Sequence, residues 1–208
     1  MEKRTFIISL LITIVCPFIA FLYDFEIVKF ISTLRTMPLN YIFLCIVFVS
    51  NTLIVFFFLT TLFLWKKHKK RWIFPLWFAS FFSVIVSYLL KIIIARPRPF
   101  QKGIPILQIV FHFIKDNFLT WNFSFPSFHA MLVFSALPFL SKGFKRFKYI
   151  WFIFACFVAF SRVYFGIHYL SDVLVGGFIG YTIGYIMVIM EEKYGLGVIL
   201  MKKLGISK

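Results

Sequence analysis

Acidic residues are scarce in this sequence, and cysteines are few. It has 7 Asp and Glu against 23 Lys and Arg, and no cluster of Asp, Glu and His offers a site for a metal ion. Cys16, Cys45 and Cys156 fall inside apolar runs without a CxxC pair or metal-like spacing, so we expect them to be small core residues. The sequence therefore predicts neither a metal ion nor another cofactor.

A soluble domain, a repeat array and a low-complexity linker are also missing. Of the 208 residues, 62% are hydrophobic and 22% are aromatic, and the mean hydropathy is +0.94. A chain of this composition is too apolar for an ordinary soluble domain. We expect an integral membrane protein in which residues 1–208 form a single membrane-embedded domain.

The net charge of +16 would suit a nucleic-acid partner. The basic residues, however, lie in short clusters between apolar segments rather than along one continuous face. We therefore expect no nucleic-acid partner, and no feature of the sequence points to an obligate protein partner. The basic start of the chain resembles a signal peptide, but no A-x-A-like site closes it, which favours an uncleaved first membrane span.

Six apolar stretches are long enough to cross about 30 Å of hydrocarbon as helices. We therefore predict an all-α, polytopic membrane protein with six transmembrane helices. The fourth and fifth stretches are short for spans, so their ends are expected to tilt or to lie partly inside the protein. The predicted spans cover residues 5–23, 40–65, 72–95, 127–141, 149–166 and 169–190.

The distribution of Lys and Arg predicts how these spans are oriented. Fifteen of the 23 basic residues lie on one side of the six spans, near both termini and in the clusters at 66–71 and 142–148. We therefore expect the chain to lie in the cell (inner or cytoplasmic) membrane with both termini in the cytoplasm.

Three polar clusters interrupt the apolar sequence at the opposite ends of these spans. A charged side chain costs roughly 2.5–3.5 kcal/mol at the centre of a bilayer, so charges in or beside membrane spans need a reason. The topology predicts that the clusters meet on the periplasmic or extracellular side in one anion-binding site. They are Lys91 with Arg98-Pro99, Pro126-Ser127-Phe128-His129, and Ser161-Arg162 with His168 and Asp172.

The spacing inside the clusters is compatible with phosphate chemistry. His168 and Asp172 are four residues apart, so the carboxylate can accept a hydrogen bond from one ring nitrogen and leave the other free to attack. Pro126-Ser127 is typical of a helix start, where free N–H groups attract anions. Each feature alone also has a structural explanation, as an ion pair, a helix cap or an interfacial anchor. Three cations would complete a phosphate cage: Lys91, Arg98 and Arg162.

The segments around the clusters suggest how the site is enclosed. Residues 96–126 are expected to form a lid or wall over it, because the prolines that follow the third span prevent a regular helix. Residues 24–37 are predicted to lie flat at the membrane interface. Three further cations are interpreted as interfacial anchors: Arg96, Lys102 and Lys115. Within the spans, helix-packing roles are assigned to Asn51 and to a glycine stripe, Gly176, Gly180 and Gly184.

Taken together, the clusters resemble the three motifs of the type 2 phosphatidic acid phosphatase (PAP2) superfamily, integral-membrane lipid phosphate phosphatase branch. The motifs are Lys91-x6-Arg98-Pro99, Pro126-Ser127-x-His129 and Ser161-Arg162-x5-His168-x3-Asp172, and the resemblance covers about residues 85–185. It implies a metal-independent phosphatase with a phosphohistidine intermediate, in which His168 is the nucleophile, Asp172 orients it and His129 protonates the leaving oxygen. The implied phosphate-binding residues are Lys91, Arg98, Ser127, Phe128 through its backbone, and Arg162, with Ser161, Pro126 and Pro99 in support.

Phe128 departs from the family's pattern, which usually has Gly at this position and uses its N–H to hold the phosphate. Phe128 keeps that N–H, which is usable provided that the position needs no positive φ. Its ring could narrow the pocket or touch the lipid tail.

The resemblance implies a lipid phosphate or diphosphate substrate in the outer leaflet of the bilayer, and undecaprenyl diphosphate is our first expectation. Phosphatidylglycerophosphate, phosphatidic acid and lipid A are alternatives within the same chemistry. Two other classes stay open. A non-catalytic protein that binds or transports anionic lipids would need the cations but not an acid and an oriented base. A vanadate-dependent peroxidase fits poorly with six spans and so little soluble sequence.

Overall fold

The computed structural model describes residues 3–65, 67–106 and 122–203, and for residues 3–14, 67 and 68 it describes the backbone only. All the named elements in these ranges are helices, so the prediction of an all-α fold is confirmed. In chain order they are α1 (Lys3–Thr33), α2 (Met37–Val49), α3 (Thr52–Leu64), η1 (Lys67–Trp72), α4 (Ile73–Ile94), η2 (Pro99–Lys102), α6 (Phe128–Ser135), α7 (Leu137–Gly143), α8 (Phe147–Tyr164), α9 (Leu170–Tyr194) and α10 (Leu196–Lys203).

Three helical segments in the described part of the chain are long and apolar enough to cross a membrane: Lys69–Ile94, Phe147–Tyr164 and Leu170–Tyr194. The pair α2 and α3, bent by 60° at a short break, adds a fourth if it counts as one span. The predicted span at 5–23 lies within α1, and the predicted span at 127–141 is divided into the short helices α6 and α7. The count of six spans therefore stays a prediction.

The break between α2 and α3 falls inside the predicted span at 40–65. Asn51 caps α3, because its side-chain oxygen accepts a hydrogen bond from the Leu53 N–H at 2.9 Å. Such a cap satisfies a backbone donor that a new helix leaves free. Our interpretation of Asn51 as a residue that joins helices is therefore wrong, and its side chain starts a helix instead.

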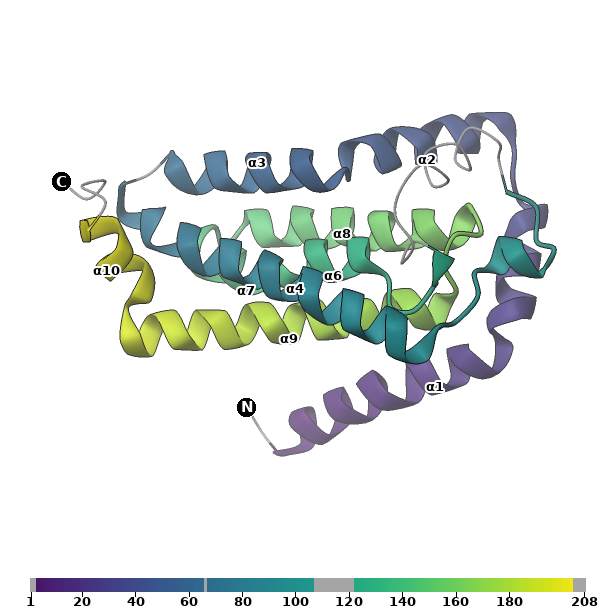
Figure 1. The fold of residues 1–208 in the computed structure, drawn as a ribbon, viewed down its shortest axis with the longest axis horizontal. Coiled ribbons are helices and arrows are strands. Elements are labelled where there is room, and N and C mark those ends of the chain that lie inside the picture. The colour runs from purple at the N-terminus through teal and green to yellow at the C-terminus, as the bar shows by residue number, and fades with distance from the viewer. Residues whose placement is uncertain (1–2, 66, 107–121, 204–208) are drawn as a thin grey trace.

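Helix α1 continues through most of the segment that we predicted to lie flat at the interface. It ends only at Thr33, and Figure 1 shows that its C-terminal part changes direction and runs toward α2. Asp24 within it is only 3% exposed. The segment at 24–33 is therefore part of a long, bent helix that packs against the bundle and not a separate interfacial piece.

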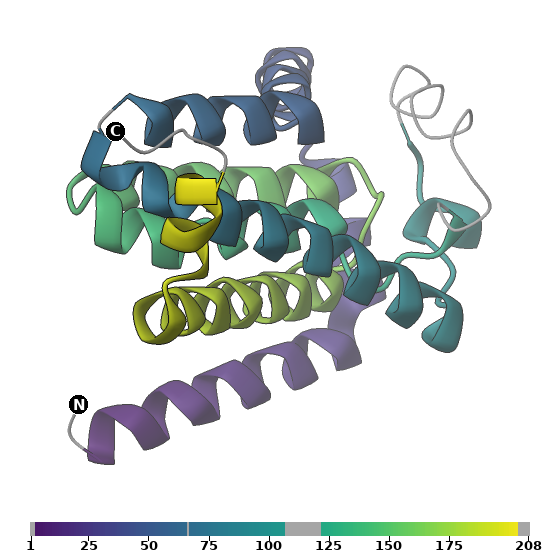
Figure 2. The same ribbon diagram turned by 60° about the vertical axis from the view of Figure 1, so that its left-hand side comes forward.

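The short helix α6 lies in the middle of the bundle, in contact with α3, α4, α8 and α9. In Figures 1 and 2, α4, α8 and α9 extend in similar directions around it, and α1 runs along α9. The predicted glycine stripe of α9 faces α6: a Cβ at Gly176, Gly180 or Gly184 would lie 2.7, 2.0 or 2.1 Å from a backbone oxygen of α6 or its N-cap. The prediction of close helix packing is confirmed.

The outer surface of the bundle is apolar. Large exposed side chains include Phe48, Leu53, Ile93 and Ile150, as expected for helices that face lipid tails. Cys16, Cys45 and Cys156 are exposed on this surface, so our prediction that they are core residues is wrong. A lipid-facing surface is as apolar as a core, and therefore hydropathy does not separate the two positions.

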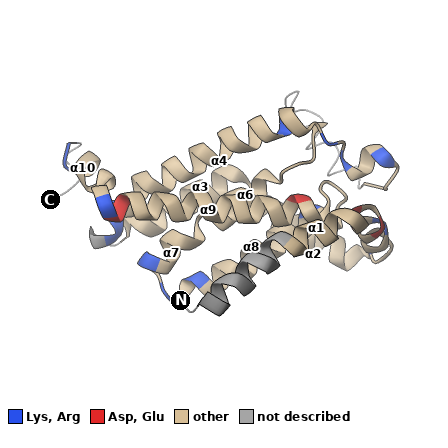
Figure 3. Cartoon of the chain, turned by 90° about the horizontal axis from the view of Figure 1, so that it is seen from below, with Lys and Arg blue, Asp and Glu red and all other residues tan. Residues whose placement is uncertain are grey.

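Lys and Arg gather at the two ends of the bundle, and the helices between them carry few charges (Figure 3). One end holds α10 and the turn between α7 and α8. The other end holds the last turn of α4 and the residues that follow it. This separation suits a protein that spans the hydrocarbon layer.

Candidate active site

The three polar clusters meet at one end of the bundle, where α4 ends, α6 begins and α8 connects to α9. They come from segments far apart in the sequence, yet their side chains are almost fully enclosed. His129 is half-buried, while the other members are buried: Lys91, Arg98, Ser127, Arg162, His168 and Asp172.

The first cluster is placed by the way α4 ends. Ala95 closes the helix in the left-handed region, with φ 46°, and the chain then turns through Pro97 and Pro99 into η2. This turn directs Arg98 inward, where its guanidinium donates to the Ile167 carbonyl at 3.0 Å. Lys91, one turn before the end of α4, donates to the Phe123 carbonyl at 2.8 Å.

His168 has its two ring nitrogens in different surroundings. Its Nε2 lies 3.5 Å from Nη1 of Arg98, and because a guanidinium only donates, Nε2 is the nitrogen with the lone pair. The proton is thus assigned to Nδ1, which lies 3.6 Å from Oδ2 of Asp172, just beyond hydrogen-bond distance. Burial, aided by the charges of Arg98 and Lys91 against the opposing effect of Asp172, lowers the pKa of His168 to about 3. The ring is therefore neutral at physiological pH.

Asp172 is held by donors from several segments. Its Oδ1 accepts from Nη1 of Arg96 at 2.7 Å. Its Oδ2 accepts from the Tyr169 N–H at 2.8 Å and from the Ser124 hydroxyl. The side chain of Arg96 is only 15% exposed, so our interpretation of this arginine as an interfacial anchor is wrong. Arg96 is a buried partner of a site carboxylate.

The second cluster lies at the start of α6. Ser127 is the residue before the helix, and its N–H donates to the Asp172 carbonyl oxygen at 3.1 Å. Its hydroxyl oxygen is buried and has no hydrogen-bond partner among the described residues. Phe128 is the first residue of the helix, so it needs no positive φ. Its ring packs against the main hydrophobic core, which leaves its backbone N–H at the helix start beside Ser127.

Arg162 lies in the last turn of α8 and reaches toward the break between α2 and α3. Its Nη2 donates to the Ser50 hydroxyl at 2.6 Å, while its Nε is buried without a hydrogen-bond partner in the described part of the chain. The neighbouring Ser161 donates to the Val158 carbonyl of its own helix at 2.7 Å. The hydroxyl of Ser161 is thus engaged within α8.

The site holds more positive than negative charge. Asp172, its buried carboxylate, is already paired with Arg96. Three further cations converge on the same place, namely Lys91, Arg98 and Arg162. Together with the unpartnered donors of Ser127 and Arg162, this surplus suits a compact anion with several oxygens, such as a phosphoryl group.

Several residues of the site were not predicted from the sequence. Asp24 follows a long apolar run, and an acidic residue at such a position is a functional signal in a membrane protein, while Arg96 occupies a variable position inside the first predicted motif. Ser50 and Ser124 carry no such signal, because serines are common in helices and loops. About half of the lid predicted over the site, together with Lys115, falls in residues 107–121, outside the described residues.

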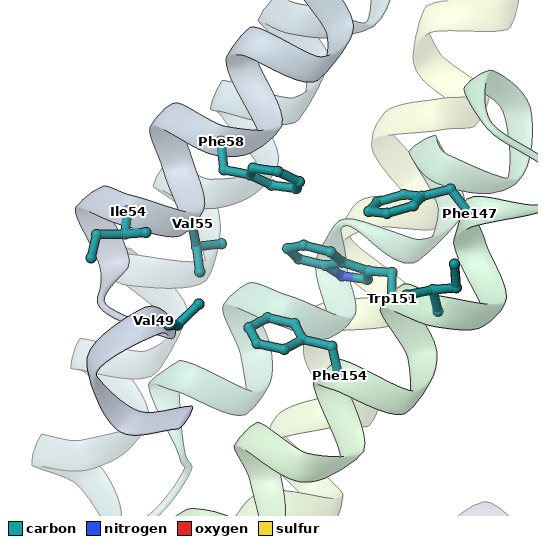
Figure 4. A pocket seen from close by; sticks show the side chains of 8 residues that line it. Val49, Ile54, Val55, Phe58, Phe147, Trp151 and Phe154 are labelled. Atoms are coloured by element: carbon teal, nitrogen blue, oxygen red, sulfur yellow. The ribbon is translucent and has the colours of Figure 1, made fainter. Parts of the chain in front are cut away.

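An apolar cavity of about 260 Å³ opens between α3 and α8. Figure 4 shows Val49, Val55 and Phe58 on one wall and the aromatic side chains of Phe147, Trp151 and Phe154 on the other. Val49, which lines it, directly precedes Ser50, the hydroxyl partner of Arg162. The lining residues are Val49, Ile54, Val55, Phe58, Phe147, Ile150, Trp151 and Phe154.

An all-helical bundle with several membrane-length apolar helices is typical of a multi-pass membrane protein, and a buried surplus of cations at one end is the arrangement expected of an anion-binding site. The sequence profile of the PAP2 superfamily matches residues 72–195, more than half of the chain. The chain belongs to the PAP2 superfamily.

The chain is similar to a phosphatidylglycerophosphatase B from Bacillus subtilis (strain 168), with 36% identity over 83 residues. This match covers 35% of the chain and 41% of that protein, so it spans less than half of the curated relative. Among solved structures, the fold resembles Aquifex aeolicus LpxE, with a TM-score of 0.66 and 27% identity over 80% of this chain and 94% of that one.

A second solved structure is a transmembrane PAP2 type phosphatidylglycerolphosphate phosphatase from Bacillus subtilis. Its TM-score is 0.65 and its identity 24%, over 82% of this chain and 85% of that one. At this identity the likeness concerns the fold alone. Both structural matches cover about four fifths of this chain, which is more than the motif region alone.

Proposed function

We propose that the chain hydrolyses the phosphate or diphosphate head group of a membrane lipid through a phosphohistidine intermediate. The observation that carries the proposal is the position of His168, whose lone-pair nitrogen Nε2 lies beside Arg98 and whose other nitrogen faces Asp172. A neutral, oriented imidazole inside a ring of cations is what attack on a phosphorus atom requires.

In the first step, Nε2 of His168 attacks the terminal phosphorus, and the bond from that phosphorus to the oxygen of the leaving group breaks. The leaving group is the lipid alcohol of a monophosphate or the lipid monophosphate of a diphosphate, and its oxygen takes a proton from protonated His129, which lies in the first turn of α6. In the second step, water attacks the phosphohistidine and gives up a proton to His129, which releases phosphate and restores neutral His168. Asp172 stabilises the positive charge of the imidazole during both steps.

The transferred phosphoryl group carries charge on its three outer oxygens. We assign these oxygens to the side chains of Lys91, Arg98 and Arg162, the Ser127 hydroxyl and the Phe128 N–H. The first three supply positive charge and the last two lie at the start of α6, where backbone donors are free. A group with five fixed donors needs no metal ion to neutralise it, and so we expect metal-independent hydrolysis.

For the substrate we keep undecaprenyl diphosphate as the first candidate, with the head group at the outer face of the membrane and the cation-rich end with α10 in the cytoplasm. The apolar cavity between α3 and α8 begins beside Ser50 and extends away from Arg162. It offers a place for the hydrocarbon tail of a lipid whose phosphate lies in the cage. Similarity to phosphatidylglycerophosphatase B makes phosphatidylglycerophosphate the second candidate.

The test is phosphate release by the purified protein in detergent, with excess chelator, across a panel of lipid monophosphates and diphosphates. We expect release from at least one lipid class, and no release by His168→Asn. If neither candidate is hydrolysed but another lipid phosphate is, the substrate assignment fails and the chemistry stands. Tight binding of all the lipids without any release would instead favour a lipid-binding protein.

A further inference from the structure

Arg96 bridges two buried carboxylates that come from opposite ends of the chain. Its Nη2 lies 2.8 Å from Oδ2 of Asp24 on α1, and its Nη1 lies 2.7 Å from Oδ1 of Asp172 on α9. The guanidinium also lies over the ring of Tyr169, 4.0 Å from its centre. This arrangement places one cation between two anions, both of which are at most 3% exposed.

Asp24 does more than balance the charge of Arg96. Its Oδ1 accepts from the Ser171 N–H at 3.0 Å, and its Oδ2 accepts from the Ser171 hydroxyl. Arg96 in turn donates to the same hydroxyl oxygen at 2.8 Å. Asp24, Ser171 and Arg96 thus form a closed ring of contacts around the first turn of α9, immediately before Asp172.

Arg96 helps to fix which oxygen of Asp172 faces His168. Arg96 holds Oδ1, and Oδ2, which also accepts from the Tyr169 N–H and the Ser124 hydroxyl, lies 3.6 Å from Nδ1 of His168. Rotation of the carboxylate would break the contact between Arg96 and Asp172, while Asp24 keeps the guanidinium in place. We propose that Arg96 and Asp24 are a positioning pair, which acts on the reaction through Asp172, by holding its carboxylate in the orientation that steadies the His168 ring and by compensating its charge.

This inference rests on the proposed function, because it assigns Asp172 the task of orienting His168. A simpler explanation is that Asp24 and Arg96 merely fasten α1 to the bundle. The two explanations differ in what they predict for catalysis, since a fastening can be loosened without changing the state of His168.

The charged groups around His168 allow the two explanations to be distinguished by the pH dependence of kcat/KM. Asp172 faces it from α9, Lys91 faces it from α4, and Arg98 from the segment after α4, while Arg96 and Asp24 stand behind Asp172. Loss of the Arg96 cation leaves the charge of Asp172 less compensated, which favours protonation of His168. The acidic limb of kcat/KM should therefore move to higher pH when Arg96 is removed.

The chain offers a matched control at the far end of α9. Arg71 pairs with Glu191, with Nε 3.3 Å from Oε1, and Glu191 is also a fully buried carboxylate of α9. This pair joins η1 to α9 and α10 but lies away from the polar clusters. The Arg71 side chain is 38% exposed, so Arg71→Ala removes an arginine from a half-buried ion pair without touching the site.

A cavity beside Arg96 allows a more specific test. It has a volume of about 530 Å³ and is lined by Asp24, Arg96 and Tyr169 together with Phe21 and Ala95, among others. In Arg96→Ala, the space left by the arginine side chain would be continuous with this cavity. Free guanidinium ion, added well below denaturing concentrations, can then reach the position between Asp24 and Asp172.

The experiment compares Arg96→Ala, Arg96→Lys, Asp24→Asn and Arg71→Ala with the unchanged protein, with a lipid phosphate that the unchanged protein hydrolyses. We expect Arg96→Ala to lower kcat by about 10- to 100-fold with little change in KM, and to shift the acidic limb upward. Arg96→Lys and Asp24→Asn should lower kcat by less and should not move the acidic limb upward, because the first keeps the cation and the second removes an anion. Guanidinium should restore Arg96→Ala but not His168→Asn. Arg71→Ala should lower the melting temperature and leave kcat and the pH profile unchanged.

The positioning role is overturned if Arg96→Ala and Asp24→Asn keep normal kcat and an unmoved acidic limb, or if they behave like Arg71→Ala. Should Arg96→Ala fail to fold, Arg96→Lys and Asp24→Asn carry the same test through kcat. An unchanged protein that hydrolyses no lipid phosphate would refute the proposed function itself, which is a separate outcome.

Discussion

Helix α9 carries a buried carboxylate near each end, and the two are used differently. Asp172 and Glu191 are both 1% exposed or less, and each is paired with an arginine from another element. Glu191 also accepts from the Gly197 N–H at 2.6 Å, which ties α10 to α9. At that end the charge of Glu191 is balanced by Arg71, and its second carboxylate oxygen accepts a hydrogen bond from the backbone.

The end with Asp172 is not balanced in this way. After Asp172 has its arginine, three further cations and two unpartnered donors remain around it. Burying such charges is costly unless a partner compensates them. The comparison teaches that a buried ion pair alone marks a structural contact, and that a surplus of buried cations marks a site for an anionic substrate.

Removal of the nucleophile should show the largest difference in turnover between the two ends of α9. His168→Asn is expected to lower turnover about a thousandfold or more, because no neighbour replaces a nucleophile in an interdependent set. Glu191→Gln should leave turnover unchanged and lower only the thermal stability. Steady-state phosphate release and thermal unfolding of both variants check this, and near-normal turnover of His168→Asn would show that the attacking group is misassigned.

Two glycines test whether close packing matters equally at the two ends of the bundle: Gly176 in α9 near the site, and Gly197 in α10 at the other end. A Cβ on Gly176 would lie 2.7 Å from the Ser127 carbonyl, and a Cβ on Gly197 would lie 2.1 Å from the Arg71 carbonyl. Gly176→Ala should displace the start of α6 and reduce kcat/KM by about 10- to 100-fold. Gly197→Ala should destabilise the protein with normal kcat/KM. Equal kinetic effects would mean that general loosening of the bundle, and not the position of Ser127, determines activity.

The pH profile should report the low pKa of His168. Burial lowers that pKa to about 3, so the reactive neutral form persists as the pH falls, and activity is lost only as the pH approaches that value. The acidic limb of kcat/KM should therefore lie well below the ordinary histidine pKa of about 6.5. The alkaline limb, which requires protonated His129, should disappear in His129→Gln. An acidic limb near 6.5 would contradict the buried, cation-surrounded environment.

The smallest effect is expected at Phe128, where only the backbone N–H faces the phosphate in our proposal. Its ring packs into the core between the two ends of the bundle. Phe128→Gly should therefore preserve turnover while lowering the melting temperature. Activity assays on the folded variant check this, and loss of turnover there would show that the ring organises the site.

The sequence predicted the helical class and the residues that meet at the site, because the motif spacing is local and hydropathy marks the helices. It did not predict Asp24, Ser50 or Ser124, since each reaches the site through contacts between segments far apart in the chain. The break at Ser50 was not predicted either. The polar residues Ser50-Asn51-Thr52 interrupt the apolar stretch, but such residues also occur inside a single span, and the cap at Asn51 is what shows that a new helix begins there.

The central claim is that His168 carries the phosphoryl group, and a single-turnover experiment tests it most directly. The protein would be mixed with a lipid phosphate in the presence of excess chelator, quenched rapidly at alkaline pH and digested for mass spectrometry. The account predicts a transient phosphate on His168, stable in alkali and labile in acid, which is missing in His168→Asn. Phosphate on another residue, or product formation without any phosphorylated protein, would contradict it.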